Sequence, residues 1–305
     1  MLLNISEKIR QKALDLGFSY CGIAAVDSLD FESEKLNTWL ENGFHGEMQY
    51  MENYSDKRKN PALLIENAKS VISVLLNYFP LTKIDETDNY KLAKYAYGKD
   101  YHYIIKSRLN QIIELIQQEF PESSSRAFCD SAPVMDKVWA QRSGLGWIGK
   151  NTCLITPKTG SFFLIGEIIT DIELSYDTPI KDHCGNCSRC IDACPTHAIL
   201  APYQLDARKC LSYLTIEYKN DLTPEMKLAQ NDWIFGCDIC QDVCPWNIKF
   251  AAPTNDIDLQ PTENLIKMRK KDWQQLSKPD FNNLFKNTAL ERTGYLRLKR
   301  NISDF

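Results

Sequence analysis

Apolar residues recur at helical spacing at the start of the chain, and the pattern ends at a glycine. Gly17 follows the first apolar positions, which are Ile5, Ile9, Ala13 and Leu16. Spacings of three or four residues place these side chains on one face of a helix. The sequence therefore predicts an amphipathic helix over 5–16.

Continuous apolar runs predict buried strands between further helical segments. The predicted helices cover 32–42 and 104–120, and the predicted strands cover 18–26, 70–78 and 160–172. Pro80 follows the second of these strands and Pro121 follows the longer helix, and proline ends both kinds of element. Because helices alternate with strands, we expect residues 1–175 to form an α/β domain.

Two cysteine runs, each closed by a Cys-Pro dipeptide, follow this domain. The first run has the spacing Cys-x2-Cys-x2-Cys-x3-Cys-Pro, and the second lacks only its first cysteine, for which Cys210 stands further upstream. This spacing is typical of bacterial ferredoxins, in which the fourth cysteine of each run binds the cluster of the other run. We therefore expect two 4Fe-4S clusters, one bound by Cys184, Cys187, Cys190 and Cys244 and the other by Cys210, Cys237, Cys240 and Cys194.

Other uses of these thiols fit the spacing less well. Structural zinc also takes four thiolates, but zinc sites favour paired Cys-x2-Cys motifs and do not explain two Cys-Pro endings. A disulfide scaffold is disfavoured by the odd number of 11 cysteines and by an amino terminus that lacks a signal peptide. Cys21, Cys129 and Cys153 lie in apolar contexts and are interpreted as buried thiols.

The cysteine runs and the residues after them complete the predicted fold. Residues 176–252 are expected to form a ferredoxin-like domain, and residues 253–305 a basic helical segment. The predicted fold class is therefore α+β, with an amino-terminal α/β domain, a double 4Fe-4S domain and a short helical carboxy-terminal segment. A content of 44% hydrophobic and 25% charged residues is ordinary for a globular chain.

The charge pattern argues against general nucleic-acid affinity but leaves local basic surfaces. The net charge is −4 and the pI is about 5.7. Basic residues outnumber acidic ones over 267–300, and over 91–108 they alternate with tyrosines. Such interleaving suits stacking on unpaired bases, although solvated helix faces have the same composition. No apolar run approaches the roughly 20 residues of a membrane span. We expect a cytoplasmic monomer with no membrane partner.

One glycine-rich loop matches two nucleotide-binding motifs in sequence but not in its predicted structural context. Residues 144–151 satisfy Gly-x-Gly-x-x-Gly and, except for Asn151, the phosphate-binding pattern Gly-x4-Gly-Lys-Ser/Thr. Those loops need a strand before them and a helix after them, whereas here a predicted helix over 134–142 precedes the loop and a predicted strand over 153–156 follows it. We therefore expect the glycines to permit close approach of a flat ligand or of another element.

Three segments, together with the cysteine runs, resemble the epoxyqueuosine reductase family over nearly the whole chain. They are Tyr97-Gly-Lys-Asp-Tyr-His102, Asp130-Ser-Ala-Pro-Val134 and Gly144-Leu-Gly-Trp-Ile-Gly-Lys-Asn151. The resemblance implies an oxidoreductase that binds cobalamin on its amino-terminal domain. Such enzymes, relatives of reductive dehalogenases, reduce the epoxide of epoxyqueuosine at the tRNA wobble position to give queuosine, the last step of queuosine biosynthesis.

Further implications concern the electron source and the length of the chain. The resemblance implies an external low-potential donor whose electrons reach cobalamin through the two clusters. Members of the family often carry a helical-repeat domain, and that repeat would begin near Arg300 here. The expectation is therefore that this domain is either naturally absent or removed by shortening of the chain.

The resemblance also implies which residues form the site. Asp130 maps onto the family's proton donor. The implied cobalamin contacts are Arg58, Asn151, Leu154, Ile165, Ser212, Cys237 and Asp238. Because Asp100-Tyr-His102 lacks the glycine of the Asp-x-His-x-x-Gly motif, the corrin is expected without a histidine ligand. The segment after Ser212 lies beside this implied site, so we expect tRNA anticodon-arm contacts from Tyr213, Thr215, Glu217, Tyr218, Lys219 and Asn220.

The local sequence offers a second interpretation of Asp130. Ser131 and Pro133 match the cap and first turn of a helix, whose dipole would lower the pKa of a nearby carboxyl group. A proton donor at neutral pH would then need desolvation by corrin and substrate to offset this effect. Without the resemblance, a helix-capping role is the simpler interpretation.

Two other classes of function remain open from the sequence. A cobalamin-dependent reductase of a small molecule, such as a dehalogenase, would use the same cofactors, although the basic and aromatic segments and the missing export signal favour tRNA. An electron carrier would need only the cysteine runs and would leave residues 1–175 without a role.

Overall fold

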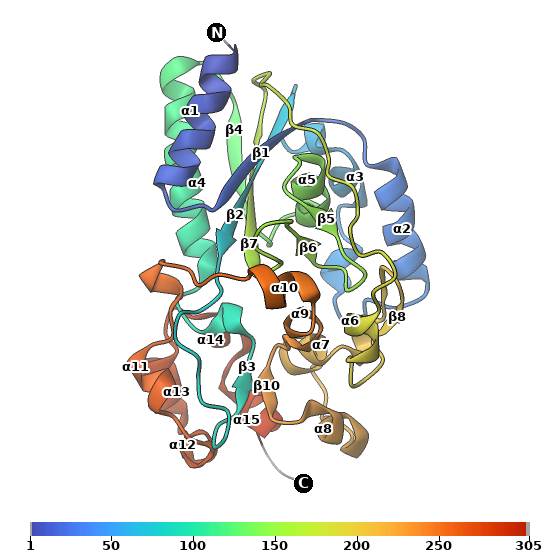
Figure 1. Cartoon of the computed structure of the whole chain (residues 1–305), viewed down its shortest axis with the longest axis vertical. Helices are drawn as coiled ribbons and strands as arrows, with labels where there is room; N and C mark the ends of the chain where they lie inside the picture. The colour runs from blue at the N-terminus through green and yellow to red at the C-terminus, as the bar shows by residue number, and fades with distance from the viewer. Residues whose placement is uncertain (1, 303–305) are drawn as a thin grey trace.

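The computed structural model describes residues 2–302 and centres its upper half on one four-stranded sheet (Figure 1). The strand order is β1-β2-β7-β4 and every pairing is antiparallel. The strands are β1 (Tyr20–Ala25), β2 (Ser70–Asn77), β4 (Ser125–Phe128) and β7 (Phe163–Thr170). The predicted strands are thus confirmed to within a few residues. The alternation of helices and strands does not build a parallel α/β sheet here, because β1, β2 and β7 pair directly as antiparallel neighbours.

Two long helices cover one face of this sheet. They are α1 (Leu2–Asp15) and α4 (Tyr101–Glu119), which lie side by side in Figure 1. Their apolar faces share a core with the sheet, as the predicted helical spacing requires. Gly166 allows α4 to approach closely, since a Cβ there would lie 2.5 Å from Ile105 Cγ2. The predicted helices 5–16 and 104–120 are confirmed, the second with an earlier start.

The opposite face of the sheet carries shorter helices and smaller apolar clusters. The helices on this side of the sheet are α2 (Asp30–Glu41), α3 (Ser55–Lys59) and α5 (Asp136–Arg142). Trp139 of α5 packs with Val71 and Ile169 of the sheet, while Leu75 and Ile165 form a second cluster with Ala140. This face, and not the one under α4, is the one on which the glycine-rich loop lies.

The lower half of the molecule mixes residues from distant parts of the sequence. Strand β3 (Lys91–Leu92) pairs in parallel with β10 (Trp233–Phe235). Carboxy-terminal helices surround this pair, and their apolar residues share one core with residues 84–97. Trp273 is fully buried there and its indole N–H donates to Asn89 Oδ1 at 2.8 Å. The helices are α11 (Glu263–Lys267), α12 (Lys270–Gln275), α13 (Lys278–Leu284), α14 (Ala289–Thr293) and α15 (Tyr295–Ile302).

The cysteine-rich segment lies between the sheet and this lower core as a set of short elements. Its helices are α6 (Arg189–Asp192), α7 (Leu211–Ile216), α8 (Pro224–Gln230), α9 (Ile239–Asp242) and α10 (Pro245–Phe250), and its hairpin is β8 (Ile199–Ala201) with β9 (Gln204–Leu205). Helices α6 and α9 occupy equivalent places in the two cysteine runs and contact each other.

The remaining elements are a small hairpin and single turns of 3-10 helix. The hairpin pairs β5 (Trp147–Ile148), which lies within the glycine-rich segment 144–151, with β6 (Leu154–Ile155). The 3-10 turns are Gln49–Met51, Pro61–Leu63, Lys94–Ala96, Ala207–Lys209 and Ile257–Leu259. Over residues 2–302, no helix combines the length and apolar character that crossing a membrane requires.

Candidate functional site

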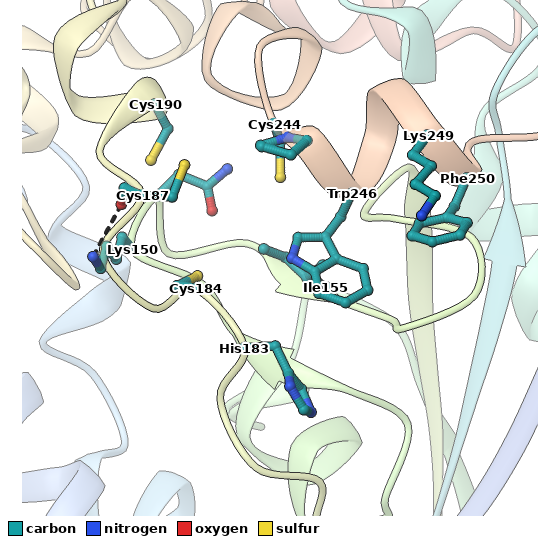
Figure 2. A pocket seen from close by; sticks show the side chains of 12 residues that line it. Lys150, Ile155, His183, Cys184, Cys187, Cys190, Cys244, Trp246, Lys249 and Phe250 are labelled. Carbon is teal, nitrogen blue, oxygen red and sulfur yellow. Dashed lines mark hydrogen bonds between the residues drawn. The ribbon is translucent and has the colours of Figure 1, made fainter.

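Four cysteines from the two runs line one cavity of about 360 Å³ (Figure 2). Three come from the first run and the fourth ends the second run, and they are Cys184, Cys187, Cys190 and Cys244. The structure therefore brings together the first of the two ligand sets that the spacing predicts, including the cysteine from the distant run.

The other four cysteines gather on the far side of this segment. Burial raises the pKa of the Cys237 thiol to about 12, and the nearby Cys210 and Cys194 thiols raise it further. The pKa of the Cys240 thiol is raised by a hydrogen bond with Cys153 and by burial, and the Cys210 and Cys237 thiols raise it further. Cys194 thus faces the second set although Cys190, four positions earlier, faces the first. Within residues 2–302, no three His, Cys, Asp or Glu side chains converge on a point that would suit a single metal ion.

Aromatic side chains form one wall of the first cavity. Trp147 is fully buried and packs edge-on against Trp246, with ring centroids 4.9 Å apart. His183 contacts the same indole, and Phe250 stacks on Trp246. Apolar walls of this kind lower the local dielectric and shield thiolate sulfurs from water. Figure 2 shows Cys184 and Cys244 facing the cavity beside this wall.

The glycine-rich loop braces the cysteine segment. Lys150 Nζ donates to the backbone oxygens of Gly185 and Cys187 at 2.6 and 2.9 Å. Gly146 permits a close approach within the hairpin, since a Cβ there would lie 2.2 Å from the carbonyl oxygen of Ile155. The order of elements around the loop is helix, loop, strand, as the sequence predicts. The glycines therefore serve contact with a neighbouring element.

Asp130 lies in a network of charged and hydrogen-bonding side chains. Tyr101 donates its hydroxyl proton to Asp130 Oδ2 at 2.6 Å, and His102 Nε2 lies 3.5 Å from the same oxygen. His102 Nδ1 is 2.8 Å from Asp100 Oδ1, so the imidazole is held between two carboxylates. Arg292 of α14 completes the group, with Nη1 3.3 Å from His102 Nε2 and Nε 3.3 Å from Asp100 Oδ2.

These contacts shift the pKa values of Asp130 and His102 in opposite directions. The hydrogen bond from His102 holds the pKa of Asp130 below its usual value, with help from Tyr101 and against the effect of burial. Burial lowers the pKa of His102, but the Asp100 and Asp130 carboxylates outweigh it and the net pKa is raised. In this open arrangement, with the Asp130 side chain 62% exposed, the carboxyl is ionised at neutral pH and the imidazole retains its proton over a wider pH range.

The helix-cap interpretation of Asp130 is wrong. Helix α5 begins at Asp136 with Met135 as its cap residue, so Ser131 and Pro133 belong to the loop before it. Asp130 adopts a left-handed backbone conformation with φ of 55°. The predicted lowering of its pKa is confirmed, but the cause is the His102 and Tyr101 side chains and not a helix dipole.

The implied cobalamin contacts fall on the α5 face of the sheet and next to the second cysteine set. Leu154 and Ile165 share an apolar cluster there. Asn151 donates from Nδ2 to the carbonyl of Cys240 at 3.3 Å, which links this apolar wall to the cysteines. Ser212 is partly buried on α7. An apolar wall with polar groups at its edge suits a large, mostly apolar cofactor.

Two of the implied contacts are already engaged within the protein. The Asp238 carboxylate is buried and accepts from Lys94 N at 2.8 Å, and Lys94 Nζ lies 3.3 Å away. Arg58 is buried on α3 and donates to the backbone oxygens of Asn53 and Tyr50. Both side chains shape the local backbone in this structure.

The segment expected to contact tRNA divides into buried and outer residues. Thr215 is fully buried, and its hydroxyl accepts from Gly236 N and donates to Leu211 O. Tyr213 is also buried, and its hydroxyl accepts from Glu47 N. The outer residues are Glu217, Tyr218, Lys219 and Asn220.

A second cavity, of about 610 Å³, adjoins the outer residues of this segment. Lys219 lines it together with side chains from the carboxy-terminal helices. Half of these are basic or aromatic, namely Lys278, Phe281, Tyr295, Arg297 and Arg300, and Glu291 is the acidic one. The basic tail and the segment after Cys210 thus line one cavity.

The sequence signal for the Asp130 network is the pair Asp100 and His102. Asp100 and His102 are two residues apart at a helix start, where Asp100 caps α4 by accepting from His102 N at 3.1 Å. The pair resembles part of a cobalamin motif in sequence but forms a carboxylate–imidazole contact in the structure. Nothing in the sequence indicates Arg292, because its approach depends on how the carboxy-terminal helices pack.

Two sequence families match parts of the chain. The family described as "Epoxyqueuosine reductase QueG, DUF1730" matches residues 58–131, a span that contains Arg58, His102 and Asp130. The family described as "4Fe-4S double cluster binding domain" matches residues 183–247, which include every cysteine of the two sets.

Relatives and solved structures match over almost the whole chain. An epoxyqueuosine reductase of Cellulophaga algicola is 51% identical over 97% of this chain and 96% of its own length. That of Escherichia coli is 38% identical over 99% and 80%. An epoxyqueuosine reductase crystallised with an epoxyqueuosine-modified tRNA-Tyr stem loop has a TM-score of 0.90 at 28% identity, covering 98% of this chain and 80% of that one. A Bacillus subtilis enzyme, with its catalytic aspartate loop swung out of the active site, has a TM-score of 0.89 at 27% identity and the same coverage.

Proposed function

Since the chain belongs to the epoxyqueuosine reductase family, we propose that Asp130 protonates the epoxide oxygen of its substrate and that His102 supplies the proton. The protein reduces the epoxide of epoxyqueuosine in tRNA to give queuosine, and its cysteine-rich domain binds two 4Fe-4S clusters. One observation supports the proposal most directly: the Asp130 carboxylate is bonded to Tyr101 and faces a histidine whose pKa is raised.

The chain supplies two sets of thiolates and an apolar wall for its cofactors. We propose that the cavity set, Cys184, Cys187, Cys190 and Cys244, holds one cluster and that Cys194, Cys210, Cys237 and Cys240 hold the other. The proposed cobalamin contacts are Arg58, Asn151, Leu154, Ile165, Ser212, Cys237 and Asp238. The clusters and cobalamin supply the two electrons of the reaction, which an external low-potential donor delivers to the protein.

The proton count explains why Asp130 needs partners. Conversion of the epoxide to an alkene takes two electrons and two protons and releases one water molecule. Asp130 is ionised in this open structure, so it must gain a proton before it can give one. His102 lies 3.5 Å away with a raised pKa and can give that proton, whereas the Arg292 guanidinium has no proton to give at neutral pH. A bound substrate would exclude water and favour the neutral Asp130 carboxyl.

A single-turnover assay tests the assignment. The protein is reconstituted anaerobically with iron, sulfide and cobalamin, reduced, and mixed with tRNA that carries epoxyqueuosine. Nucleoside mass spectrometry then measures queuosine. Loading of both clusters and of corrin without queuosine after repeated reduction would contradict the proposed function.

His102→Gln is expected to abolish the fall of the single-turnover rate with rising pH. The folded-state pKa of His102 is raised above 6.5, so the imidazolium is present at lower pH and is lost as pH rises through that pKa. The wild-type single-turnover rate should therefore fall as pH rises, and His102→Gln should be slower, by about 10²-fold or more, without this fall. Asp100→Asn, which removes a carboxylate that raises this pKa, should move the fall to lower pH. An unchanged wild-type profile in His102→Gln would exclude the imidazole as proton source.

The outer residues Glu217, Tyr218, Lys219 and Asn220 are proposed to contact the anticodon arm. Lys219→Ala should weaken tRNA binding whatever the base sequence and reduce the slope of log K against log salt by about 1, because one phosphate contact is lost. Filter binding over a salt series measures both quantities. Lys83→Ala, another exposed lysine outside this surface, is the matched control and should leave the slope unchanged.

The division of labour along the chain follows from these assignments. We propose that residues 1–175 carry the acid and most cobalamin contacts, that residues 176–252 carry the clusters, and that the basic helices of 253–305 support tRNA binding. Monomeric and cytoplasmic action remains the expectation from the sequence.

A further inference from the structure

We propose that Glu167 and Asp136 form a buried carboxyl pair that shares one proton and positions the loop carrying Asp130. The inference rests on the proposed role of Asp130 and adds two positioning residues to it. Neither Glu167 nor Asp136 belongs to the cofactor, cluster or tRNA contacts assigned above.

Glu167 is the charged residue of an otherwise apolar strand. It lies in the middle of β7, opposite Ser73 of β2 and Phe128 of β4, and is 0% exposed. Neither of its carboxylate oxygens accepts a hydrogen bond from an N–H or hydroxyl group of the residues that the structure describes. A carboxylate in such surroundings strongly favours its protonated form. Burial of the Glu167 carboxyl group therefore costs free energy, and no hydrogen bond within the sheet offsets this cost.

Asp136 is the partner of Glu167. It is the first residue of α5, the helix that covers this face of the sheet, and its carboxyl group hydrogen-bonds that of Glu167. Two carboxyl groups form such a bond only when one of them carries a proton. Burial raises the pKa of both groups, and the mutual charge raises that of Glu167 further. One shared proton leaves the two buried carboxyl groups with a single negative charge between them.

Asp136 also ends the loop that carries Asp130. The loop runs from Phe128, at the end of β4, to Asp136, and the backbone of Asp130 acts on the Asp136 carboxyl group by lowering its pKa, against the larger effect of burial. The loop's own backbone bonds are short-range, from Ser131 N to Cys129 O and from Val134 N to Ala132 O. The carboxyl pair therefore anchors the carboxy-terminal end of the loop to β7, while Tyr101 holds the Asp130 side chain.

The charges around the pair fit a single negative charge on it. Arg58 of α3 is the cation whose field reaches Asp136. From the loop, Asp130 and Cys129 face the pair, and Lys106 of α4 acts on Cys129 in turn. From β2, Ser73 presents a hydroxyl that accepts from Ser143. Loss of the shared proton would place a second negative charge beside Asp130, and repulsion would then oppose the closed loop.

Three variants separate positioning from general stability. Glu167→Gln keeps a hydrogen-bond donor toward Asp136 but cannot titrate, and Glu167→Leu removes the donor while keeping an apolar side chain of similar size. Ser73→Ala, on the same buried face, is the matched control. Iron content and thermal unfolding of the reconstituted protein verify that each variant is folded.

Loop opening is measured by limited proteolysis within 129–135 as a function of pH. We expect faster cleavage in Glu167→Leu than in wild type, Glu167→Gln or Ser73→Ala. We also expect cleavage to rise with pH in wild type and to stay level in Glu167→Gln. Because this readout needs no substrate, it decides the inference even if the chain forms no queuosine.

Single-turnover rates provide the second readout. Glu167→Leu should slow queuosine formation by about 10²-fold, since a displacement of the acid by about 1 Å has an effect of that size. Tight binding of tRNA should persist, and Glu167→Gln should stay close to wild type. The inference is overturned if Glu167→Leu reacts and is cleaved like wild type, or if Glu167→Gln is as impaired as Glu167→Leu.

Discussion

Asp130→Asn should lower the single-turnover rate of queuosine formation by about 10²- to 10⁴-fold, the range expected for loss of a positioned proton donor. Asparagine has nearly the same shape, and its amide oxygen still accepts the Tyr101 hydroxyl, so the loop keeps its conformation. What the variant loses is the proton that the carboxyl group receives from His102. The expected defect is therefore in the rate constant at saturating tRNA and not in tRNA affinity.

The controls for this variant are chosen to exclude loss of cofactors or of fold. Iron and corrin content should match those of wild type, and so should the temperature of thermal unfolding. Asp85→Asn changes an exposed carboxylate and should leave the rate unaltered. Retention of more than about one tenth of the wild-type rate by Asp130→Asn would remove this residue from the role of acid.

Paired cysteine substitutions should show that the two runs exchange their last ligands. Each 4Fe-4S cluster needs four thiolates, so any single Cys→Ser change among the eight should cost one cluster and about half of the iron. Cys190→Ser combined with Cys244→Ser should cost no more iron than either change alone, because both residues face one cavity. Cys190→Ser combined with Cys194→Ser should lose nearly all iron, although these residues are neighbours in sequence. Iron losses from substitutions at two ligands of one cluster do not add, whereas losses from substitutions at ligands of different clusters add.

Iron analysis and low-temperature EPR after reconstitution measure these outcomes. Cys21→Ser is the matched control, because Cys21 lies on β1, away from the cluster segment, and should keep both clusters. All cluster variants should lose single-turnover activity by more than about 10²-fold if both clusters lie on the electron path. The opposite result, with half of the iron kept in the Cys190 and Cys194 double variant, would establish an uncrossed assignment.

The helices and strands whose formation depends on neighbouring residues in the sequence were predictable. The apolar spacing identified α1 and α4, and the continuous apolar runs identified β1, β2 and β7, because these signals depend on neighbouring residues. Strand direction was not predictable in this way. Direction depends on which strands meet, and here β2 and β7 pair although many residues separate them.

The candidate site shows the same division. Cysteine spacing was sufficient to group the ligands, because it reflects a local motif used twice. Arg292 could not be assigned, since it reaches His102 only through packing of α14 against the start of α4. Glu167 had a signal that sequence reading could have used: a single acidic residue in the apolar run Phe163–Thr170 must be paired or functional.

The sharing of one core by residues 84–97 and the carboxy-terminal helices has a consequence for biosynthesis. At about 5–20 residues per second, a ribosome that has added Asp130 needs roughly 10–30 s more to add Arg292. Throughout that interval the nascent chain has the acid and its histidine but not the arginine beside them, and the helices that share a core with Tyr90 and Leu92 are added only in its last part. Translation that stops between the second cysteine run and Arg292 would thus release a polypeptide with every cluster thiol and an unfinished active site.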